Sequence, residues 1–324
     1  GVERGDRLWT SPISFVASSN CGLYCGASVD FVDIDPEIFN ICPNSLEEKL
    51  LRAEQYGELP KVLVVVHMAG QSADMETIFS LSRRFNFRII EDASHAIGSE
   101  YETGKTGSCK YSDICVFSFH PVKIITSGEG GLATTNCEKL YEKMLLLRSH
   151  GITRNIKNFN SKKFEDSWYY EQQELGFNYR MTDIHAALAL SQLGRLNGYV
   201  KARKKIAFKY LDCFGNLGVG LPKLMIGAES SWHLFVIKLR DKNTRREVFN
   251  ALKAKNIGVN VHYIPVHLQP YYQALGFKLG DFPESEYDYE RSISLPIFPK
   301  LTDTQHNYVI NSLYELQESF DLEI

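Results

Sequence analysis

The 324-residue sequence has no long hydrophobic run and little excess of charge of either sign. Its apolar stretches are far shorter than the roughly 20 residues that a membrane-spanning helix needs, so we expect no membrane partner. The formal net charge is −3, which gives no general attraction to nucleic acid. Hydrophobic residues make up 44% of the chain and charged residues 23%, proportions typical of a globular protein long enough for two domains.

The sequence also lacks a cysteine pattern. Its seven cysteines are scattered, and Cys21 and Cys25 have no second pair at the spacing of zinc ligands. We therefore predict no metal site and interpret the cysteines as reduced thiols. With no visible secretion signal, this favours a cytoplasmic protein.

Strand and helix patterns alternate over the first 150 residues. The clearest strand is Pro60–Val66, a nearly continuous β-branched run typical of a strand buried on both faces. The alternation predicts an α/β fold with a mainly parallel, doubly wound sheet. The other predicted strands are Ser28–Asp33, Arg88–Ile90, Asp113–Phe119 and Gly131–Thr135. The predicted helices are Ile13–Tyr24, one capped by Ser72, and one capped by Asn136 and closed by Gly151.

The pattern changes after residue 150. Residues 155–173 are polar and aromatic without a clear period, which indicates a long excursion. An apolar helix at Asp183–Leu196 and a basic helix at Val200–Phe214 then lead to a smaller α+β unit. We place a large domain at 1–199 and a small C-terminal domain at 200–324. The small domain is predicted to hold strands Trp232–Leu239 and Val259–Ile264 and helices with capping boxes at Thr244 and Thr302.

A single lysine, Lys123, closes the stretch SFHPVK (118–123) at the end of a predicted strand. Lysine is rarely buried, because its charge is costly to desolvate. Desolvation lowers the pKa of an amine and makes it a usable nucleophile toward aldehydes. The stretch therefore suggests chemistry, although a lysine on a surface loop is the alternative interpretation.

An acid stands at the end of another predicted strand, where Asp92 lies in the motif EDASHAIG (91–98). Open α/β sheets bind ligands at the carboxyl ends of their strands. A lysine and an acid on two such ends are what pyridoxal phosphate needs, since the lysine bonds to its aldehyde and the acid holds the proton on its ring nitrogen. Asp92 as a helix cap or turn former is the alternative, and the pairing with Lys123 favours function.

Four motifs together suggest a family: EDASHAIG (91–98), SFHPVK (118–123), GEGG (128–131) and LGFNYRMTD (175–183). In these the chain resembles the DegT/DnrJ/EryC1/StrS sugar aminotransferases, over nearly its whole length from Trp9. The resemblance implies the aspartate aminotransferase fold, which is fold type I of the pyridoxal-phosphate-dependent transferases. It also implies that the strand after Lys123 is antiparallel.

Finer features narrow the expected substrate: TSPISFVASSN (10–20), RSHGITR (148–154), WYYEQQELGFNYRMTDIHAAL (168–188) and VNVHYIPVHLQPYY (259–272). These resemble family members that move the amino group of L-glutamate to C4 of a UDP-linked 4-keto-6-deoxy-N-acetylhexosamine. Such a reaction serves pseudaminic acid biosynthesis. Another nucleotide-linked keto sugar remains the alternative.

The resemblance assigns five residues to the cofactor. Lys123 bonds to the aldehyde of the cofactor and later moves a proton between the substrate carbon and C4′ of the cofactor. Asp92 keeps the ring nitrogen protonated. His95 contacts the phenolic oxygen, Ser118 binds the phosphate, and Phe15 lies against the ring. A core imidazole at His95 and a core aromatic at Phe15 are the alternatives.

Five more residues are implied for the partner subunit and the substrate. Asn178 matches an asparagine that reaches the phosphate from the other subunit of a homodimer with shared sites, and Arg180 could hold a carboxylate or phosphate. A turn former and a structural ion pair are the respective alternatives. His262, Tyr263 and His267 are expected to line the sugar-nucleotide cleft.

The resemblance further implies a segment upstream of Gly1, with an opening helix and a loop of the form SGTAA that cradles the phosphate. We therefore expect the sequence to be part of a longer protein. On that expectation the 324-residue chain alone binds pyridoxal phosphate weakly.

Two other functions are open on the same fold. Some family members are dehydratases with histidine in place of the lysine, and Lys123 argues against that reaction. A non-catalytic regulator that binds cofactor or sugar would be favoured by a missing lysine or acid, and both are present.

Overall fold

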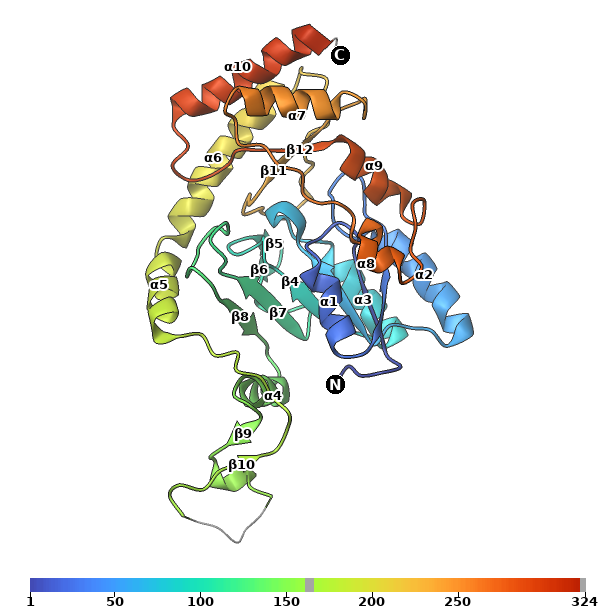
Figure 1. Ribbon diagram of the computed structural model, residues 1–324, viewed down its shortest axis with the longest axis vertical. Coiled ribbons are helices and arrows are strands. Elements are labelled where there is room, and N and C mark those ends of the chain that lie inside the picture. Colours follow the sequence, from blue (N-terminus) through green and yellow to red (C-terminus); the bar gives the residue numbers. More distant parts are fainter. Residues whose placement is uncertain (161–165, 321–324) are drawn as a thin grey trace.

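A six-stranded sheet in the order β2-β1-β3-β4-β7-β8 forms the centre of the computed structural model, which describes residues 1–160 and 166–320 (Figure 1). Strands β2, β1, β3, β4 and β7 are parallel, and β8 runs antiparallel to β7. The predicted mainly parallel sheet is confirmed, and so is the antiparallel strand after Lys123. Its strands are β1 (Arg7–Thr10), β2 (Ser28–Phe31), β3 (Val62–Val66), β4 (Arg88–Asp92), β7 (Ile114–Ser118) and β8 (Gly131–Thr134).

Strand β3 shows why helices cover both faces of the sheet. Its five residues are all buried, as the β-branched run predicts. Leu63 and Val65 pack into the hydrophobic cluster under the helices of one face, while Val62 and Val64 pack with Leu8 on the other. The helices around this sheet are α1 (Ala17–Tyr24), α2 (Pro43–Tyr56) and α3 (Met75–Phe85). Helix α4 (Glu138–Arg148), which has no buried residue, lies beyond the end of β8 (Figure 1).

Helix α1 lies unusually close to the sheet. A Cβ on Gly22 would stand 3.0 Å from the side chains of both Leu8 and Val29, so a larger residue would push the helix away from β1 and β2. The first turn of α1 follows the loop of residues 11–16 after β1. Its Ser18 lies at the carboxyl end of β4, where the Ser18 hydroxyl is 2.6 Å from Asp92 Oδ2.

Three predicted helix starts are wrong. The helix predicted from Ile13 begins only at Ala17, because residues 11–16 form a loop. Asp74, not Ser72, caps α3 by accepting from the Thr77 amide at 3.1 Å. Asn136 does not cap α4, since its amide donates instead to the Ser108 carbonyl at 2.8 Å.

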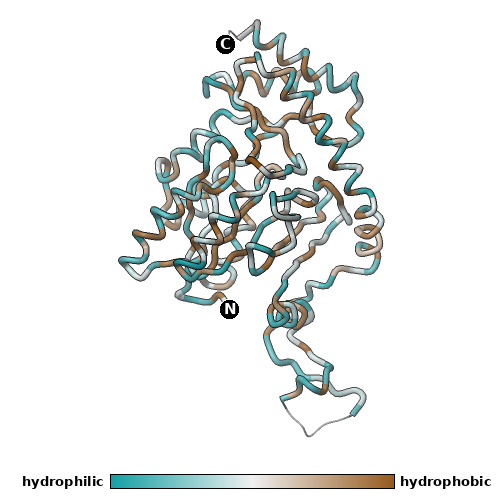
Figure 2. The backbone as a smooth tube through the Cα atoms, turned by 180° about the vertical axis from the view of Figure 1, so that it is seen from behind, coloured by the Kyte–Doolittle hydropathy of each residue, from teal (hydrophilic) through white to brown (hydrophobic). Residues whose placement is uncertain are grey.

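A thin arm projects from the body of the protein, formed by residues 151–160 and 166–175 (Figure 1). It carries the short antiparallel pair β9 (Ile152–Thr153) and β10 (Glu171–Gln172). Hydrophilic positions dominate it in Figure 2. Of the excursion predicted for residues 155–173, residues 155–160 and 166–173 belong to this arm, and residues 161–165 lie outside the described part of the chain. Helix α5 (Asp183–Leu193) returns from the arm along the side of the sheet, with Thr182 as its N-cap.

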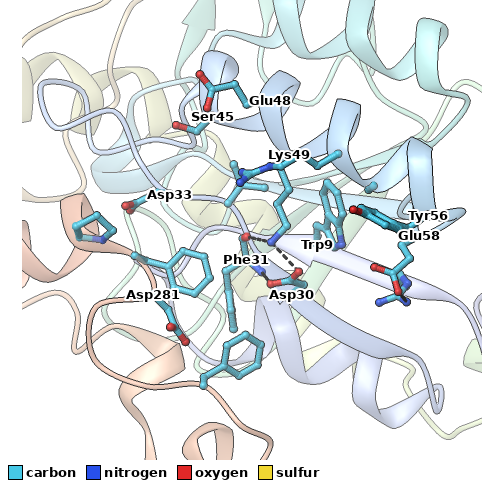
Figure 3. Close-up of a pocket in the computed structure, with 17 residues that line it drawn as sticks. Trp9, Asp30, Phe31, Asp33, Ser45, Glu48, Lys49, Tyr56, Glu58 and Asp281 are labelled. Carbon is cyan, nitrogen blue, oxygen red and sulfur yellow. Dashed lines mark hydrogen bonds and ion pairs between the residues drawn. The ribbon is translucent and has the colours of Figure 1, made fainter.

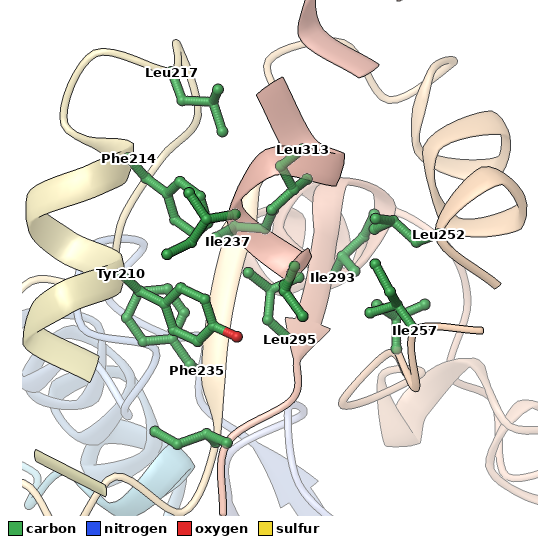
Figure 4. Close-up of a cluster of buried hydrophobic side chains, with 14 of the residues drawn as sticks. Tyr210, Phe214, Leu217, Phe235, Ile237, Leu252, Ile257, Ile293, Leu295 and Leu313 are labelled. Atoms are coloured by element: carbon green, nitrogen blue, oxygen red, sulfur yellow. The ribbon is translucent and has the colours of Figure 1, made fainter. Parts of the chain in front are cut away.

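A second hydrophobic core lies against the C-terminal half of α6 (Leu196–Phe214), at the opposite end of the molecule from the arm (Figures 1 and 4). Tyr210 and Phe214 from α6 pack there against Phe235 and Leu295 on a two-stranded antiparallel sheet. The smaller C-terminal α+β unit is therefore confirmed as part of the fold. Its elements are β11 (Phe235–Lys238), α7 (Arg245–Ala254), α8 (Pro270–Gln273), α9 (Pro283–Arg291), β12 (Ser292–Leu295) and α10 (Asp303–Phe320).

Some details of this unit differ from the predictions. Val259–Ile264 is not a strand, because only Asn260 pairs across to Ser294, in an isolated bridge. Strand β12 was not predicted and takes the place beside β11. Thr302 forms its capping box with Gln305, whereas the Thr244 hydroxyl donates to the Asp241 carbonyl instead of capping α7. The predicted boundary at 199/200 falls inside α6 and stays a prediction.

The remaining short pair, β5 (Glu100–Tyr101) and β6 (Gly104–Lys105), follows the β4 motif. Tyr101 donates back to the buried carboxylate of Glu91, which also accepts from Ser112 and lies 2.8 Å from His67 Nε2. His67 Nδ1 accepts from the Ala73 amide, so Nε2 carries the proton and donates to Glu91. This satisfied network fixes β4 immediately before Asp92.

Candidate active site

The carboxyl ends of β4 and β7 bring Asp92 and Lys123 to one edge of the sheet. Asp92 is the last residue of β4 and pairs in register with Val116 of the adjacent parallel strand β7. Lys123 follows the end of β7 in a turn that is closed by its amide donating to the His120 carbonyl at 3.0 Å. A cavity of about 440 Å³ lies over these two strand ends. Six of the predicted site residues line it: Phe15, Asp92, His95, Ser118, Lys123 and Tyr263.

Lys123 stands in an environment that favours its uncharged amine. Burial lowers the pKa of Lys123 below its ordinary value, and the negative charge of Asp92 opposes this only in part. Because a free amine is the nucleophilic form, a larger share of Lys123 is reactive at neutral pH than of an exposed lysine. This agrees with the role expected of the lysine from its position after the strand.

The carboxylate of Asp92 has a fixed donor on each oxygen. Oδ1 accepts from the Ser94 amide at 3.0 Å, and Oδ2 accepts from the Ser18 hydroxyl at 2.6 Å. Each carboxylate oxygen can accept about two hydrogen bonds, so both keep a position for a further donor. The group therefore faces the cavity as an oriented acceptor.

His95 and Tyr263 join the two parts of the chain across this cavity. The Tyr263 hydroxyl lies 3.1 Å from His95 Nε2, and the two rings are stacked with centroids 6.0 Å apart. Burial, and next the neighbouring His233, lower the pKa of His95 well below its usual range, so the imidazole is neutral. Burial also raises the pKa of Tyr263, which keeps its phenol protonated. The Phe15 ring, 60% exposed, stands 6.3 Å from Tyr263.

Three other predicted residues lie outside the cavity lining. Asn178 sits at the base of the arm, where it pairs with Ser149 in an isolated bridge. Arg180 lines a separate hollow of about 570 Å³ beside β8, α4 and α5. His267 is fully buried, with its Nε2 2.8 Å from Glu286 Oε1.

His262 is not part of the lining either, but it lies within electrostatic reach of Lys123. Burial, and then the charge of Lys123, lower the pKa of His262 to about 4. Its Nδ1 is 2.8 Å from the Ser294 hydroxyl, which fixes the orientation of the ring. A neutral imidazole therefore stands close to the lysine.

Sequence reasoning missed His233, whose ring centroid lies 4.4 Å from that of His95. It is buried, and burial followed by the charge of Lys123 lowers its pKa well below the usual range. The segment that carries it is clamped to Gly70, where a Cβ would meet the His233 amide at 2.9 Å. This arrangement uses a glycine at position 70 and a left-handed backbone at Trp232, beside His233. Neither feature can be recognised in the sequence as the mark of a site.

A larger hollow, of about 760 Å³, lies at the β2 edge of the sheet (Figure 3). Its central cation is Lys49, which pairs with Asp30 at 2.6 Å and lies 4.9 Å from the ring centroid of Trp9. Because this ammonium is already matched by a carboxylate and a ring face, the hollow lacks the combination of free amine and oriented acid found at Lys123. The smaller cavity is the candidate site.

The cavity fits pyridoxal phosphate by the chemistry of its side chains. It offers an amine for the aldehyde, a carboxylate for the ring nitrogen and an exposed aromatic face. Ser118 offers a hydroxyl whose oxygen accepts from the His120 amide at 3.3 Å, which leaves its proton for a phosphate oxygen. His95 Nδ1 is buried and has no hydrogen-bond partner among the described residues.

Comparison with known proteins decides the family. The DegT/DnrJ/EryC1/StrS aminotransferase family matches residues 1–314. The chain belongs to this family. It is a sugar aminotransferase, and its cofactor is pyridoxal 5′-phosphate, as for the family.

Individual relatives agree with this assignment. The aminotransferase is 40% identical to the uncharacterized protein MJ1066 of Methanocaldococcus jannaschii, over 97% of this chain and 80% of that protein. It is 36% identical to a UDP-4-amino-4,6-dideoxy-N-acetyl-beta-L-altrosamine transaminase of Campylobacter jejuni, over 95% of this chain and 78% of that enzyme. The solved structure of Helicobacter pylori PseC, an aminotransferase of pseudaminic acid biosynthesis, matches with a TM-score of 0.85 and 31% identity, covering 98% and 81% of the two chains.

The fold-type prediction is confirmed by these structural matches and by the mainly parallel sheet. Within residues 1–160 and 166–320, no helix of the aminotransferase is long and apolar enough to span a membrane.

Proposed function

We propose that this aminotransferase moves the amino group of L-glutamate to C4 of a UDP-linked 4-keto-6-deoxy-N-acetylhexosamine, a step of pseudaminic acid biosynthesis. The observation that carries the proposal is the cavity that joins a lysine of lowered pKa and an oriented aspartate to Tyr263 of the C-terminal part. The substrate class rests on the likeness to the Campylobacter jejuni transaminase and to PseC.

Lys123 and Asp92 carry the chemistry in this proposal. Pyridoxal phosphate, when bound, supplies an aldehyde that carries the amino group and a ring that accepts an electron pair. The Lys123 amine takes the proton from the α-carbon of glutamate and, in the second half-reaction, gives one to C4 of the sugar. The Asp92 carboxylate keeps the ring nitrogen protonated.

The other cavity residues position these reactants. Ser118 donates to the phosphate, and the Phe15 ring covers one face of the cofactor ring. His95 holds the phenol of Tyr263 at the cavity wall, and both remain neutral there. A buried wall of neutral groups excludes water while adding no charge beside Lys123. The sugar nucleotide enters along His262 and Tyr263, whereas His267 supports that segment through Glu286.

The proposal includes a cytoplasmic homodimer in which Asn178 reaches the phosphate of the partner's site, while Arg180 binds a carboxylate or phosphate. Helix α5 has no buried residue in the single chain, although most of its side chains are apolar. Many exposed apolar side chains on one segment are typical of an interface. The segment 175–193 carries exposed hydrophobic side chains at Leu175, Phe177, Tyr179, Ile184, Leu188, Leu190 and Leu193.

The test is turnover of defined nucleotide sugars. The protein is incubated with pyridoxal phosphate, L-glutamate and either a UDP-linked or a dTDP-linked 4-keto-6-deoxy sugar, and the products are identified by mass spectrometry. We expect a UDP-linked 4-amino sugar and an equal amount of 2-oxoglutarate. Preferential amination of the dTDP-linked sugar would reject the proposed substrate while leaving the reaction intact.

A further inference from the structure

A chain of two serine hydroxyls ends on the carboxylate of Asp92. Ser14 Oγ lies 2.7 Å from Ser18 Oγ, and Ser18 Oγ lies 2.6 Å from Asp92 Oδ2. Ser14 is 3% exposed and Ser18 is 4% exposed, so water does not compete for these contacts. Ser14 also lines the candidate cavity, which places one end of the chain at the site and the other on its acid.

The direction of the protons in this chain follows from what each group can donate. An ionised carboxylate only accepts, so Ser18 must use its single proton on Asp92. Ser18 can then only accept from Ser14, and the Ser14 proton is used as well. As a result Ser14 presents lone pairs, and no proton, to the cavity.

The backbone holds both serines in place for this arrangement. Ser14 lies in the loop of residues 11–16 after β1, and Ser18 lies in the first turn of α1. The Ser18 amide donates to the Phe15 carbonyl at 3.3 Å. Gly22, which has no side chain, lets α1 pack closely against Leu8 of β1 and Val29 of β2. Since the Ser94 amide fixes the other oxygen of Asp92, the plane of the carboxylate is set from two elements.

We propose that Ser18 is a positioning residue, which turns and polarises the Asp92 carboxylate so that it can hold the proton of a bound ring nitrogen, and that Ser14 sets the direction of the Ser18 proton. This inference rests on the role of Asp92 in the proposed function. It adds that the acid acts at its full rate only when it is oriented by the Ser18 hydroxyl from the first turn of α1. Asp92 remains the catalytic residue, and Ser18 acts through it.

The effect of losing Ser18 can be stated as a fold-change. A hydrogen bond to a charged group contributes roughly 1.5–3 kcal/mol, which corresponds to about a tenfold to hundredfold change in an equilibrium or rate. Ser18→Ala removes this bond and frees the carboxylate to turn. Ser18→Thr keeps the hydroxyl. Ser14→Ala should change less than Ser18→Ala, because Ser18 still donates to Asp92 without it.

The experiment measures protonation of the cofactor ring directly. Each variant is loaded with pyridoxal phosphate labelled with ¹⁵N in the ring, and the ¹⁵N resonance of the bound cofactor is recorded together with kcat and KM. Ser19→Ala is the matched control, because the Ser19 hydroxyl contacts Val16 and Tyr272 and not Asp92. Thermal unfolding of each variant without cofactor reports on the fold.

We expect Ser18→Ala to move the resonance toward the unprotonated position and to lower kcat about tenfold to hundredfold. Ser18→Thr and Ser19→Ala should keep the resonance of the unsubstituted protein, called the parent below. If Ser18→Ala leaves resonance and kcat within twofold of the parent while Asp92→Asn shifts the resonance, the positioning role is wrong and the role of Asp92 stands. If Asp92→Asn also leaves the resonance unchanged, both the positioning role and the assigned role of Asp92 are wrong.

Discussion

Replacing Asp92 by asparagine removes a charge from the candidate site with little change of shape. The hydroxyl chain can adapt, because the asparagine amide can donate to Ser18, Ser18 to Ser14, and the asparagine oxygen can still accept from the Ser94 amide. All three contacts survive, and only the two that involve the serine hydroxyls have their proton direction reversed. We therefore expect the Asp92→Asn variant to fold and to bind pyridoxal phosphate.

The loss of rate follows from the missing negative charge opposite the protonated ring nitrogen. Two unit charges about 4 Å apart interact by about 4 kcal/mol at an effective dielectric constant of about 20. Each 1.36 kcal/mol changes a rate tenfold, so we expect a loss of about 10³ in the half-reaction with glutamate. Reversal of the hydroxyl chain adds to this, because Ser14 then points a proton into the cavity.

The assay is rapid mixing of the cofactor-loaded variant with L-glutamate, followed by absorbance. Asp74→Asn is the matched control, since Asp74 only caps α3 and asparagine is an equally good N-cap. The control should react at the rate of the parent. A rate for Asp92→Asn within threefold of the parent would refute the assignment and require another group to protonate the ring.

Three further predictions test the other groups of the site. Lys123→Ala should abolish turnover and covalent attachment of the cofactor, as measured by activity and by borohydride trapping, and retention of half the activity would reject the lysine. Mixing Lys123→Ala with Asn178→Ala subunits should restore activity in mixed dimers, whereas heterodimers without activity would disprove shared sites. Because the pKa of Lys123 is lowered, Lys123 of the cofactor-free protein should react with an amine reagent at lower pH than exposed lysines do. Because the pKa of His262 is about 4, the His262 resonances should not titrate near pH 6.5.

The sequence predicted those features that depend on local pattern. The β-branched run of β3 was recognisable because a strand buried on both faces needs apolar residues at every position. Asp92 and Lys123 were recognisable because they follow apolar strands, where a charged residue has no packing role. Parallel strands then bring their carboxyl ends together, so two strand ends were enough to locate the cavity.

The parts that were missed depend on contacts far apart in the sequence. His233 reaches His95 because its segment packs against Gly70 and Ser231 donates to the His95 carbonyl, and no local pattern encodes that crossing. The predicted strand at Val259–Ile264 failed because β12 occupies the place beside β11. Ser18 falls inside the predicted helix Ile13–Tyr24, and no local pattern indicates that its hydroxyl meets Asp92, 74 residues further along the chain.

The most direct test of the central claim is the absorbance spectrum of the protein with pyridoxal phosphate, recorded before and after L-glutamate. If Lys123 and Asp92 form an aminotransferase site, the parent should show a visible band from the cofactor bound to Lys123. That band should disappear on addition of glutamate as an equal amount of 2-oxoglutarate is released. A spectrum that glutamate leaves unchanged, with no 2-oxoglutarate formed by a protein that has bound the cofactor, would contradict the account.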